Sequence, residues 1–284
     1  MILLWIELEE LTMKKSFNIE EFLQKYPHTK DVIEKNNINI ENLIDIYEDY
    51  IEYKNSYDNQ AEFIANILRS ESMVHSVKSR IKEPERLIEK IIRKTEDRKL
   101  KYGDDFQFTV DNYKNEINDL IGIRVIHIFK DQWREIHELI TNTWNVIEIT
   151  ANVRDGDNIK VFEDLDIEVR SKASGYRSVH YLVEFYPTNQ KVIAEIQVRT
   201  IFEEAYGEID HRLRYSHYEI PEILQSNLLL FNRIVGSADE MASLINNLST
   251  DWCEKEINYK KTIQEQEEEI KRLKSKMTWI DVNN

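Results

Sequence analysis

Glycine is scarce in this chain, and its scarcity excludes two common ways of binding nucleotides. Only six glycines occur in 284 residues, and they are dispersed at positions 103, 122, 156, 175, 207 and 236. Neither the GxGxxG pattern of dinucleotide-binding folds nor the GxxxxGK[ST] phosphate loop can be built from them. Phosphate chemistry must therefore depend on side chains and metal ions, because no glycine-lined cradle of backbone N–H groups is available.

Cysteine and long apolar runs are also sparse. Cys253 is the one cysteine, so an internal disulfide is excluded, and the seven scattered histidines complete no four-ligand zinc spacing with it. This usage predicts a reducing compartment, the cytoplasm. The opening apolar run Met1–Ile6 stops at Glu7, far short of the ~18 apolar residues of a membrane span, and it lacks a basic segment. We therefore expect a packed tail or helix start there and no membrane association.

Basic charge is scarce overall but concentrated in one segment. The formal net charge is −15, which disfavours a surface that attracts nucleic acid along its whole extent. The 41% apolar residues are enough for a sizeable core. Between Lys78 and Lys101, however, ten residues are basic, several of them at three- and four-residue spacing. One helical face could hold an anion there, or it could be a solvated face paired with the neighbouring glutamates.

Hydrophobic periodicity predicts helices at both ends and a mixed sheet between them. Apolar residues at helical steps predict two helices from Ile19 to Ser70, separated near Asn36 to Asn39. Further helices are expected at 84–99, 132–143, 201–213, 221–248 and 254–277. Short β-branched and aromatic segments predict strands at Leu120–Phe129, Val146–Val153, Ser178–Tyr186 and Val192–Arg199. The predicted fold class is α/β (α+β), with a mixed β-sheet core backed by helices.

This pattern divides the chain into three parts. A helical N-terminal extension at 1–69 precedes a central domain at 70–218, and a helical C-terminal extension follows at 219–284. The last predicted helix has a narrow apolar stripe at Ile263, Ile270, Leu273 and Met277 amid dense charge. We expect a short coiled coil there, used for self-association or a regulatory contact.

Polar side chains alternate along two of the predicted strands. Period-two geometry places Glu195, Gln197 and Arg199 on one face of their strand. Ser178 and His180 likewise share a face, so the two strands could line one cleft, although an edge strand with a solvated face would look the same. Asp119 lies at the start of another strand, where a carboxylate is either a metal ligand or a cap. Mg²⁺ takes one or two carboxylates plus substrate phosphates, so Asp119 with Glu195 would suffice.

Five ordered blocks together resemble the synthetase domain of the RelA/SpoT family. They are Arg80-Ile-Lys82 with Lys90 and Arg93, Asp119-Leu-Ile-Gly-Ile-Arg124, Lys172-Ala-Ser-Gly-Tyr-Arg-Ser-Val-His180, Glu195-Ile-Gln-Val-Arg-Thr200 and Glu208-Ile-Asp-His-Arg-Leu-Arg-Tyr215. The resemblance covers roughly residues 70 to 216. It implies a nucleotidyltransferase-like synthetase fold and the transfer of pyrophosphate from ATP to the 3′-hydroxyl of GDP or GTP, which makes pppGpp or ppGpp.

The same resemblance implies a role for each matched residue. Asp119 and Glu195 would bind Mg²⁺, and Glu195 would also accept the proton of the attacking hydroxyl. The residues implied for ATP are Arg80, Lys82, Lys90, Arg93 and Arg124, with the two arginines Arg80 and Arg124 on the adenine. The residues implied for the acceptor are Lys172, Tyr176, His180, Gln197 and Arg199, with the Tyr176 ring on the base.

Departures from the family pattern leave the acceptor open. Arg86, Ser171, Tyr206 and Ser216 replace residues that the family usually has near this site. Relatives with this domain include enzymes that use adenine nucleotides and toxins that modify the tRNA 3′ end, and a catalytically silent nucleotide-binding module is a third reading. The acidic charge balance disfavours tRNA. No His-Asp dipeptide occurs, so the resemblance implies synthesis without the family's hydrolase half. Members without that half often assemble as homo-oligomers.

Overall fold

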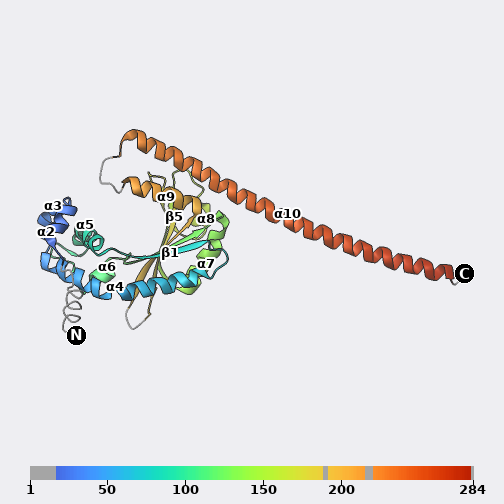
Figure 1. Ribbon diagram of the computed structural model, residues 1–284, viewed down its shortest axis with the longest axis horizontal. Coiled ribbons are helices and arrows are strands. Elements are labelled where there is room, and N and C mark those ends of the chain that lie inside the picture. The colour runs from blue at the N-terminus through green and yellow to red at the C-terminus, as the bar shows by residue number, and fades with distance from the viewer. Residues whose placement is uncertain (1–16, 188–190, 215–219, 283–284) are drawn as a thin grey trace, which may run out of the picture.

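The computed structural model describes residues 17–187, 191–214 and 220–282, with side chains described as far as residue 274 apart from that of Arg214. A six-stranded mixed sheet forms its centre, in the order β1-β2-β6-β5-β3-β4 (Figure 1). The strands are β1 (Ser76–Ile81), β2 (Ile121–His127), β3 (Asn145–Val153), β4 (Glu168–Ser171), β5 (Ser178–Phe185) and β6 (Val192–Thr200). β2 pairs with β6 and β3 with β4 in parallel, and the other neighbours are antiparallel. The α+β class predicted from periodicity is confirmed.

One face of the sheet is apolar and closed by helices. Ile123, Ile196 and Tyr181 lie in register on this face and are buried. Helix α4 (Ile40–Arg69) packs on β1 and β2, and α7 (Trp133–Thr143) packs on β3. Strands that bury one face alternate apolar and polar residues, so the apolar positions here fix which face is left for polar chemistry.

The opposite face is polar across its full width. One cross-strand row runs Lys78, Arg124, Gln197, His180, Thr150 and Glu168, one residue from each strand. Helix α5 (Pro84–Tyr102) lies at the β1 end of this face, and α9 (Ile201–Arg214) lies over it. A capping box starts α9, because Thr200 and Glu203 each accept a hydrogen bond from the other's backbone N–H. The sheet therefore offers one polar surface bounded by two helices.

Between Ile19 and Arg69 the described chain forms three helices, not the two predicted. They are α2 (Ile19–Lys25), α3 (Thr29–Lys35) and α4, and the predicted separation at Asn36 to Asn39 is confirmed. The additional break falls at Pro27, which has no N–H to donate and disfavours helix in the residue before it. Their buried side chains belong to one apolar core that runs from Phe17 to Val198. The apolar run Met1–Ile6 lies outside the described residues.

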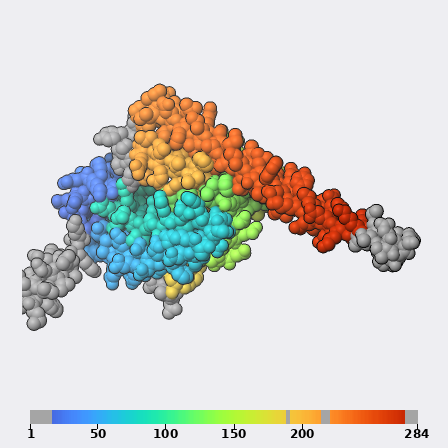
Figure 2. All heavy atoms as spheres, turned by 45° about the vertical axis from the view of Figure 1, so that its right-hand side comes forward, coloured from blue at the N-terminus to red at the C-terminus, as the bar shows by residue number. Residues whose placement is uncertain are grey.

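The C-terminal segment is one helix, not two. Helix α10 (Glu222–Val282) passes without interruption through the break predicted between Leu248 and Glu254. The five residues between them, Ser249-Thr-Asp-Trp-Cys253, include neither Gly nor Pro, and each costs less than about 0.7 kcal/mol in a helix. Its first half lies on the body, and its second half projects away from it (Figures 1 and 2). None of the helices in the described ranges is long and apolar enough to span a membrane.

Strands β1 and β4 and two one-turn helices, α6 (Tyr113–Glu116) and α8 (Lys160–Glu163), were not predicted. β1 lies in the basic segment at the sheet edge and buries only Val77, so its apolar alternation is weak. β4 has four residues and one apolar side chain, Val169. Edge strands bury little, so hydrophobic patterning gives them a weak signal.

Candidate active site

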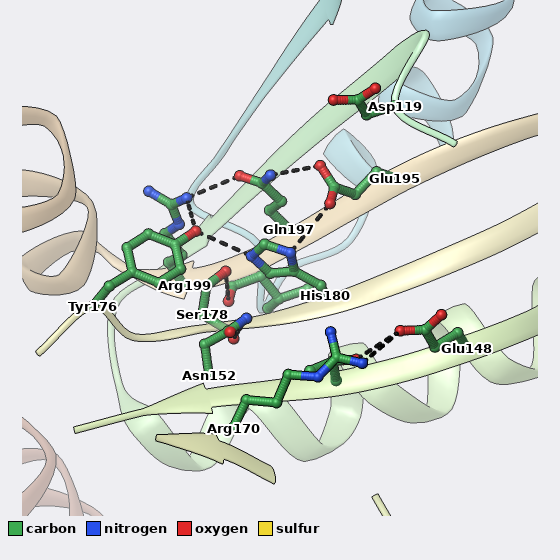
Figure 3. Close-up of polar contacts among 12 residues, drawn as sticks. Asp119, Glu148, Asn152, Arg170, Tyr176, Ser178, His180, Glu195, Gln197 and Arg199 are labelled. Carbon is green, nitrogen blue, oxygen red and sulfur yellow. Dashed lines mark hydrogen bonds and ion pairs between the residues drawn. The ribbon is translucent and has the colours of Figure 1, made fainter. Parts of the chain in front are cut away.

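Five polar side chains close a ring of hydrogen bonds on the polar face (Figure 3). Gln197 Nε2 donates to Glu195 Oε2 at 2.7 Å, and Gln197 Oε1 accepts from Arg199 at 2.8 Å. Arg199 also donates to the Tyr176 hydroxyl, which lies 3.0 Å from His180 Nε2. His180 Nδ1 lies 3.2 Å from Glu195 Oε1 and completes the ring. The predicted shared face of Glu195, Gln197 and Arg199 is thereby confirmed.

The Tyr176 ring has little freedom within this arrangement. The Arg199 guanidinium lies over it, 4.7 Å from the ring centroid, and His180 meets it edge-on at 6.0 Å. Tyr176 belongs to the six-residue loop at 172–177 between β4 and β5. The ring combines His180 from β5, three residues from β6 and Tyr176 from this loop. Its members are therefore separated in the sequence.

Asp119 forms a second cluster beside the ring. Its Oδ2 lies 2.7 Å from Lys82 Nζ and 2.7 Å from Lys90 Nζ, and its Oδ1 is buried without a hydrogen-bond partner. The Lys82 backbone N–H donates to Leu120 O at 2.9 Å, which keeps β1 and β2 together beyond the ends of the assigned strands. Figure 3 shows the Asp119 and Glu195 carboxylates on the same side of the sheet.

Asp119 and Glu195 line one cavity of about 550 Å³. Lys90, Lys172, Tyr176 and His180 also line it, from α5, the 172–177 loop and β5. Further lining residues that the sequence analysis did not select are Lys94, Arg98, Asn118, Glu148, Thr150, Asn152, Arg170 and Leu182. The cavity thus presents cations from α5 opposite carboxylates at the sheet, which suits a ligand with several phosphates and a metal ion.

The remaining residues implied for ATP lie outside this cavity. Arg80 and Arg124 share the polar face on β1 and β2, and Arg124 is held by Glu204 at 2.8 Å and by Glu208. Gly122 lies between them, where an added Cβ would be 3.1 Å from Arg80 Nε, so glycine allows Arg80 to cross β2 closely. Arg93 is exposed on α5 and does not line the cavity.

Lys94 and Arg98 line the cavity from α5, although the sequence analysis did not select them. Together with Lys90 they follow four-residue spacing, which brings all three to one helix face. Arg98 pairs with Glu116. That spacing was the signal that could have identified them, and it was obscured by the density of basic residues around it.

Burial and neighbouring charges act against each other on the two carboxylates. Burial acts to raise the pKa of Asp119, but the ammonium groups of Lys82 and Lys90 outweigh it, and the pKa lies below its usual value. Burial also opposes ionisation of Glu195, yet hydrogen bonding to His180 and Gln197 holds its pKa below the usual value. Both groups are therefore anionic at neutral pH, as metal ligation requires.

The two carboxylates fit a divalent cation whose remaining ligands come from phosphate. Within 17–187 and the other described ranges, no group of three or more His, Cys, Asp or Glu side chains is placed to hold a metal. A divalent cation that also binds phosphate oxygens and water needs only one or two carboxylates from the protein. The unpartnered Oδ1 of Asp119 leaves an acceptor free for such an ion.

Comparison with known proteins agrees with the fold. Residues 79–220, half of the chain, match the family described as the region found in RelA / SpoT proteins. The chain belongs to the RelA/SpoT family. It is 25% identical over 181 residues to the GTP pyrophosphokinase YwaC of Bacillus subtilis (strain 168), which covers 62% of this chain and 75% of that protein. It is 27% identical over 135 residues to the GTP pyrophosphokinase YjbM of the same organism, covering 45% and 57%.

Solved structures share the fold. The small alarmone synthetase 1 from Bacillus subtilis aligns with a TM-score of 0.55 at 21% identity, covering 72% of this chain and 99% of that one. The same synthetase bound to its product pppGpp aligns with a TM-score of 0.55, covering 70% and 97%. The fold predicted from the resemblance is therefore confirmed.

Proposed function

We propose that this protein is a pyrophosphokinase that transfers the β,γ-pyrophosphate of ATP to the 3′-hydroxyl of GDP or GTP. One observation carries the proposal: a single cavity contains two anionic carboxylates, a row of cations on α5 and the Tyr176 loop. Family membership and similarity to two GTP pyrophosphokinases support the same reaction. The domain at 70–218 would carry it, with helical extensions on both sides.

The reaction forms one bond and breaks one bond. The 3′-hydroxyl oxygen attacks the β-phosphorus of ATP, the bond from that phosphorus to the α,β-bridging oxygen breaks, and AMP leaves. Glu195 accepts the hydroxyl proton, since it is a partly buried anion beside His180. Its lowered pKa makes it a better metal ligand than base, so positioning of the hydroxyl would supply much of the rate.

Cations on one side of the cavity would hold the triphosphate. Lys82 and Lys90 already converge on Asp119, and Lys94 and Arg98 extend the same charge along α5. Arg80, Arg93 and Arg124 would hold the ATP from outside the cavity, the first and last of them on the adenine. Charge that develops on the transferring group is stabilised by such preorganised cations.

Asp119 and Glu195 would hold Mg²⁺. Bound there, the ion would neutralise phosphate charge and orient the β-phosphorus. Exchange of the Lys82 and Lys90 contacts for contacts to phosphate would free Asp119 for the ion.

The acceptor would occupy the side of the cavity formed by Lys172, Tyr176 and His180, with Gln197 and Arg199 behind Tyr176. Incubation of the purified protein with labelled ATP and each of GDP, GTP, ADP, ATP and tRNA tests this assignment. Label on GDP or GTP supports it. Label on an adenine nucleotide or on tRNA alone would assign the chain to the other branches of the family.

We also propose that the protein acts in the cytoplasm, with its nucleotide substrates. The projecting half of α10 supports self-association. Beyond Asn247 its described hydrogen bonds and ion pairs stay within the helix, and Trp252, Tyr259 and Ile263 are more than half exposed. Trp252 and Tyr259 are one heptad apart, as are Ile263 and Ile270. A second copy of this chain, with the same stripe, is the occupant that we propose.

A further inference from the structure

The base of α10 contacts the loop that carries Tyr176. Leu228, Asn232, Val235 and Asp239 recur at three- and four-residue steps and are buried, so this face of the helix is docked on the body. Asn232 is only 1% exposed, which is unusual for an amide side chain and requires that both of its polar atoms be satisfied.

Both ends of the Asn232 amide bind the loop. Its Nδ2 donates to Gly175 O at 2.8 Å, and its Oδ1 accepts from Arg177 at 3.4 Å. Gly175 and Arg177 are the two neighbours of Tyr176 in the chain. One side chain of α10 is thus bonded to the loop immediately before and immediately after the tyrosine.

The loop is shaped to fit that amide. Gly175 has φ +76°, a left-handed conformation that favours glycine, and an added Cβ would lie 2.8 Å from Asn232 Cγ. Arg177 is fixed in turn by Asp157, at 2.6 Å and 3.0 Å. The loop backbone therefore follows the position of Asn232 closely.

We infer that Asn232 is a positioning residue for the acceptor subsite: it holds the 172–177 loop so that Tyr176 faces the cavity. This inference rests on the proposed function for the identity of the subsite. The hydrogen bonds of Asn232 described above go to Gly175 and Arg177, neither of which lines the cavity, and Asn232 lies after the family match, which ends at residue 220. A segment outside the matched domain would thus contribute to the active site.

The Asn232→Asp variant tests the inference with almost no change in shape. It keeps an oxygen toward Arg177 but replaces the Nδ2 donor by a second carboxylate oxygen. That oxygen repels Gly175 O instead of donating to it. We expect the acceptor KM to rise about tenfold, with the ATP KM within about twofold of the parent, since loss of one buried hydrogen bond is of that size. Hydrogen exchange of peptide 172–178 should accelerate about tenfold relative to peptide 192–199 in nucleotide-free protein.

Two further variants keep the test decisive. Asn232→Ala removes both bonds without adding charge and serves if the aspartate variant does not fold. Asn227→Ala is the matched control, because Asn227 is exposed on α10 and donates only to Ile223 O of its own helix. The control should change neither KM nor loop exchange.

The outcomes separate this inference from the proposed function. Unchanged exchange in peptide 172–178, or an equal rise in both KM values, overturns the positioning role of Asn232. A parent protein that transfers pyrophosphate to no acceptor overturns the proposed function, and the exchange measurement then still decides whether Asn232 holds the loop.

Discussion

His180 Nδ1 lies 3.2 Å from Glu195 Oε1, across the antiparallel pair β5 and β6. This contact links the carboxylate that we propose as a metal ligand to the tyrosine that we propose for the acceptor, because the other nitrogen of His180 lies 3.0 Å from the Tyr176 hydroxyl. A change at Glu195 is therefore expected to affect both halves of the reaction.

Glu195→Gln should leave the fold intact and remove most pyrophosphate transfer. The amide is isosteric with the carboxylate but is neither an anionic metal ligand nor a proton acceptor, so a loss of about 100-fold or more in kcat is expected. Glu184→Gln is the matched control, because Glu184 lies on β5, on the same face of the sheet, and does not line the cavity. Near-parental turnover of the Glu195 variant would remove Glu195 from the chemistry.

Pyrophosphate transfer by the Asp119→Asn variant should depend on the Mg²⁺ concentration. Transfer should be severely reduced at low Mg²⁺ and partly restored as Mg²⁺ is raised, since a neutral ligand binds the ion more weakly. Loss of the partner of Lys82 and Lys90 should also lower the stability, by about 1 to 3 kcal/mol for a partly buried cluster. Thermal unfolding of the same sample separates the two effects, and a variant equal to the parent at every Mg²⁺ level would move the metal elsewhere.

Tyr176→Ala should weaken acceptor binding and leave ATP binding nearly unchanged. Stacking on a base contributes about 1 to 3 kcal/mol, which corresponds to about 5- to 150-fold in affinity. Tyr176→Phe keeps the ring and loses only the hydroxyl contacts to His180 and Arg199, so it should retain most of the stacking. Tyr186→Ala, at an exposed tyrosine, is the control. Equal losses for both nucleotides would show that the loop is structural.

Asp239 should make stability fall as pH rises. Burial and the neighbouring Glu203 raise the pKa of Asp239 to about 7, against the opposing charge of Lys130. The unfolded aspartate ionises near pH 4, so from about pH 4 to 7 the folded protein holds a proton that the unfolded chain has lost. This contribution is full below about pH 4 and decreases by up to about 1.4 kcal/mol per pH unit toward pH 7.

Urea unfolding at pH 5, 6, 7 and 8 checks that behaviour. Asp239→Asn should lose less stability than the parent between pH 5 and 7 and should be the more stable of the two at pH 8. Groups with lowered pKa values, such as Asp157, lose their contribution only in more acidic solution and do not interfere. Parallel curves for the two proteins would contradict the assignment.

Truncation after Leu248 should lower the oligomeric state and leave pyrophosphate transfer intact. The last described hydrogen bond between α10 and the body is that of Asn247, which donates to Asp131 Oδ2 at 3.2 Å. The removed helix would be about 50 Å long at 1.5 Å per residue. We expect the full chain to be oligomeric by light scattering and the truncated chain to have a lower mass with intact transfer. A truncated protein of unchanged mass, or one that cannot bind nucleotide, would contradict this role.

Local patterns in the sequence predicted much of the sheet and of the polar face. Alternation along β6 was enough to place Glu195, Gln197 and Arg199 together, because side-chain direction in a strand depends only on period. The closure of the ring by Tyr176 depends on the pairing of β5 with β6, which no local pattern specifies. Likewise, the docking of Asn232 on Gly175 joins segments that are distant in the sequence, so only the folded chain reveals it.

The most direct test of the central claim uses ATP labelled separately at the β- and γ-phosphates, with GTP and Mg²⁺. Pyrophosphate transfer predicts that both labels move together to the guanine nucleotide, with one AMP formed for each acceptor modified, and that Glu195→Gln abolishes both. Movement of the γ-label alone with release of ADP, or no labelled guanine nucleotide at all, would contradict the account.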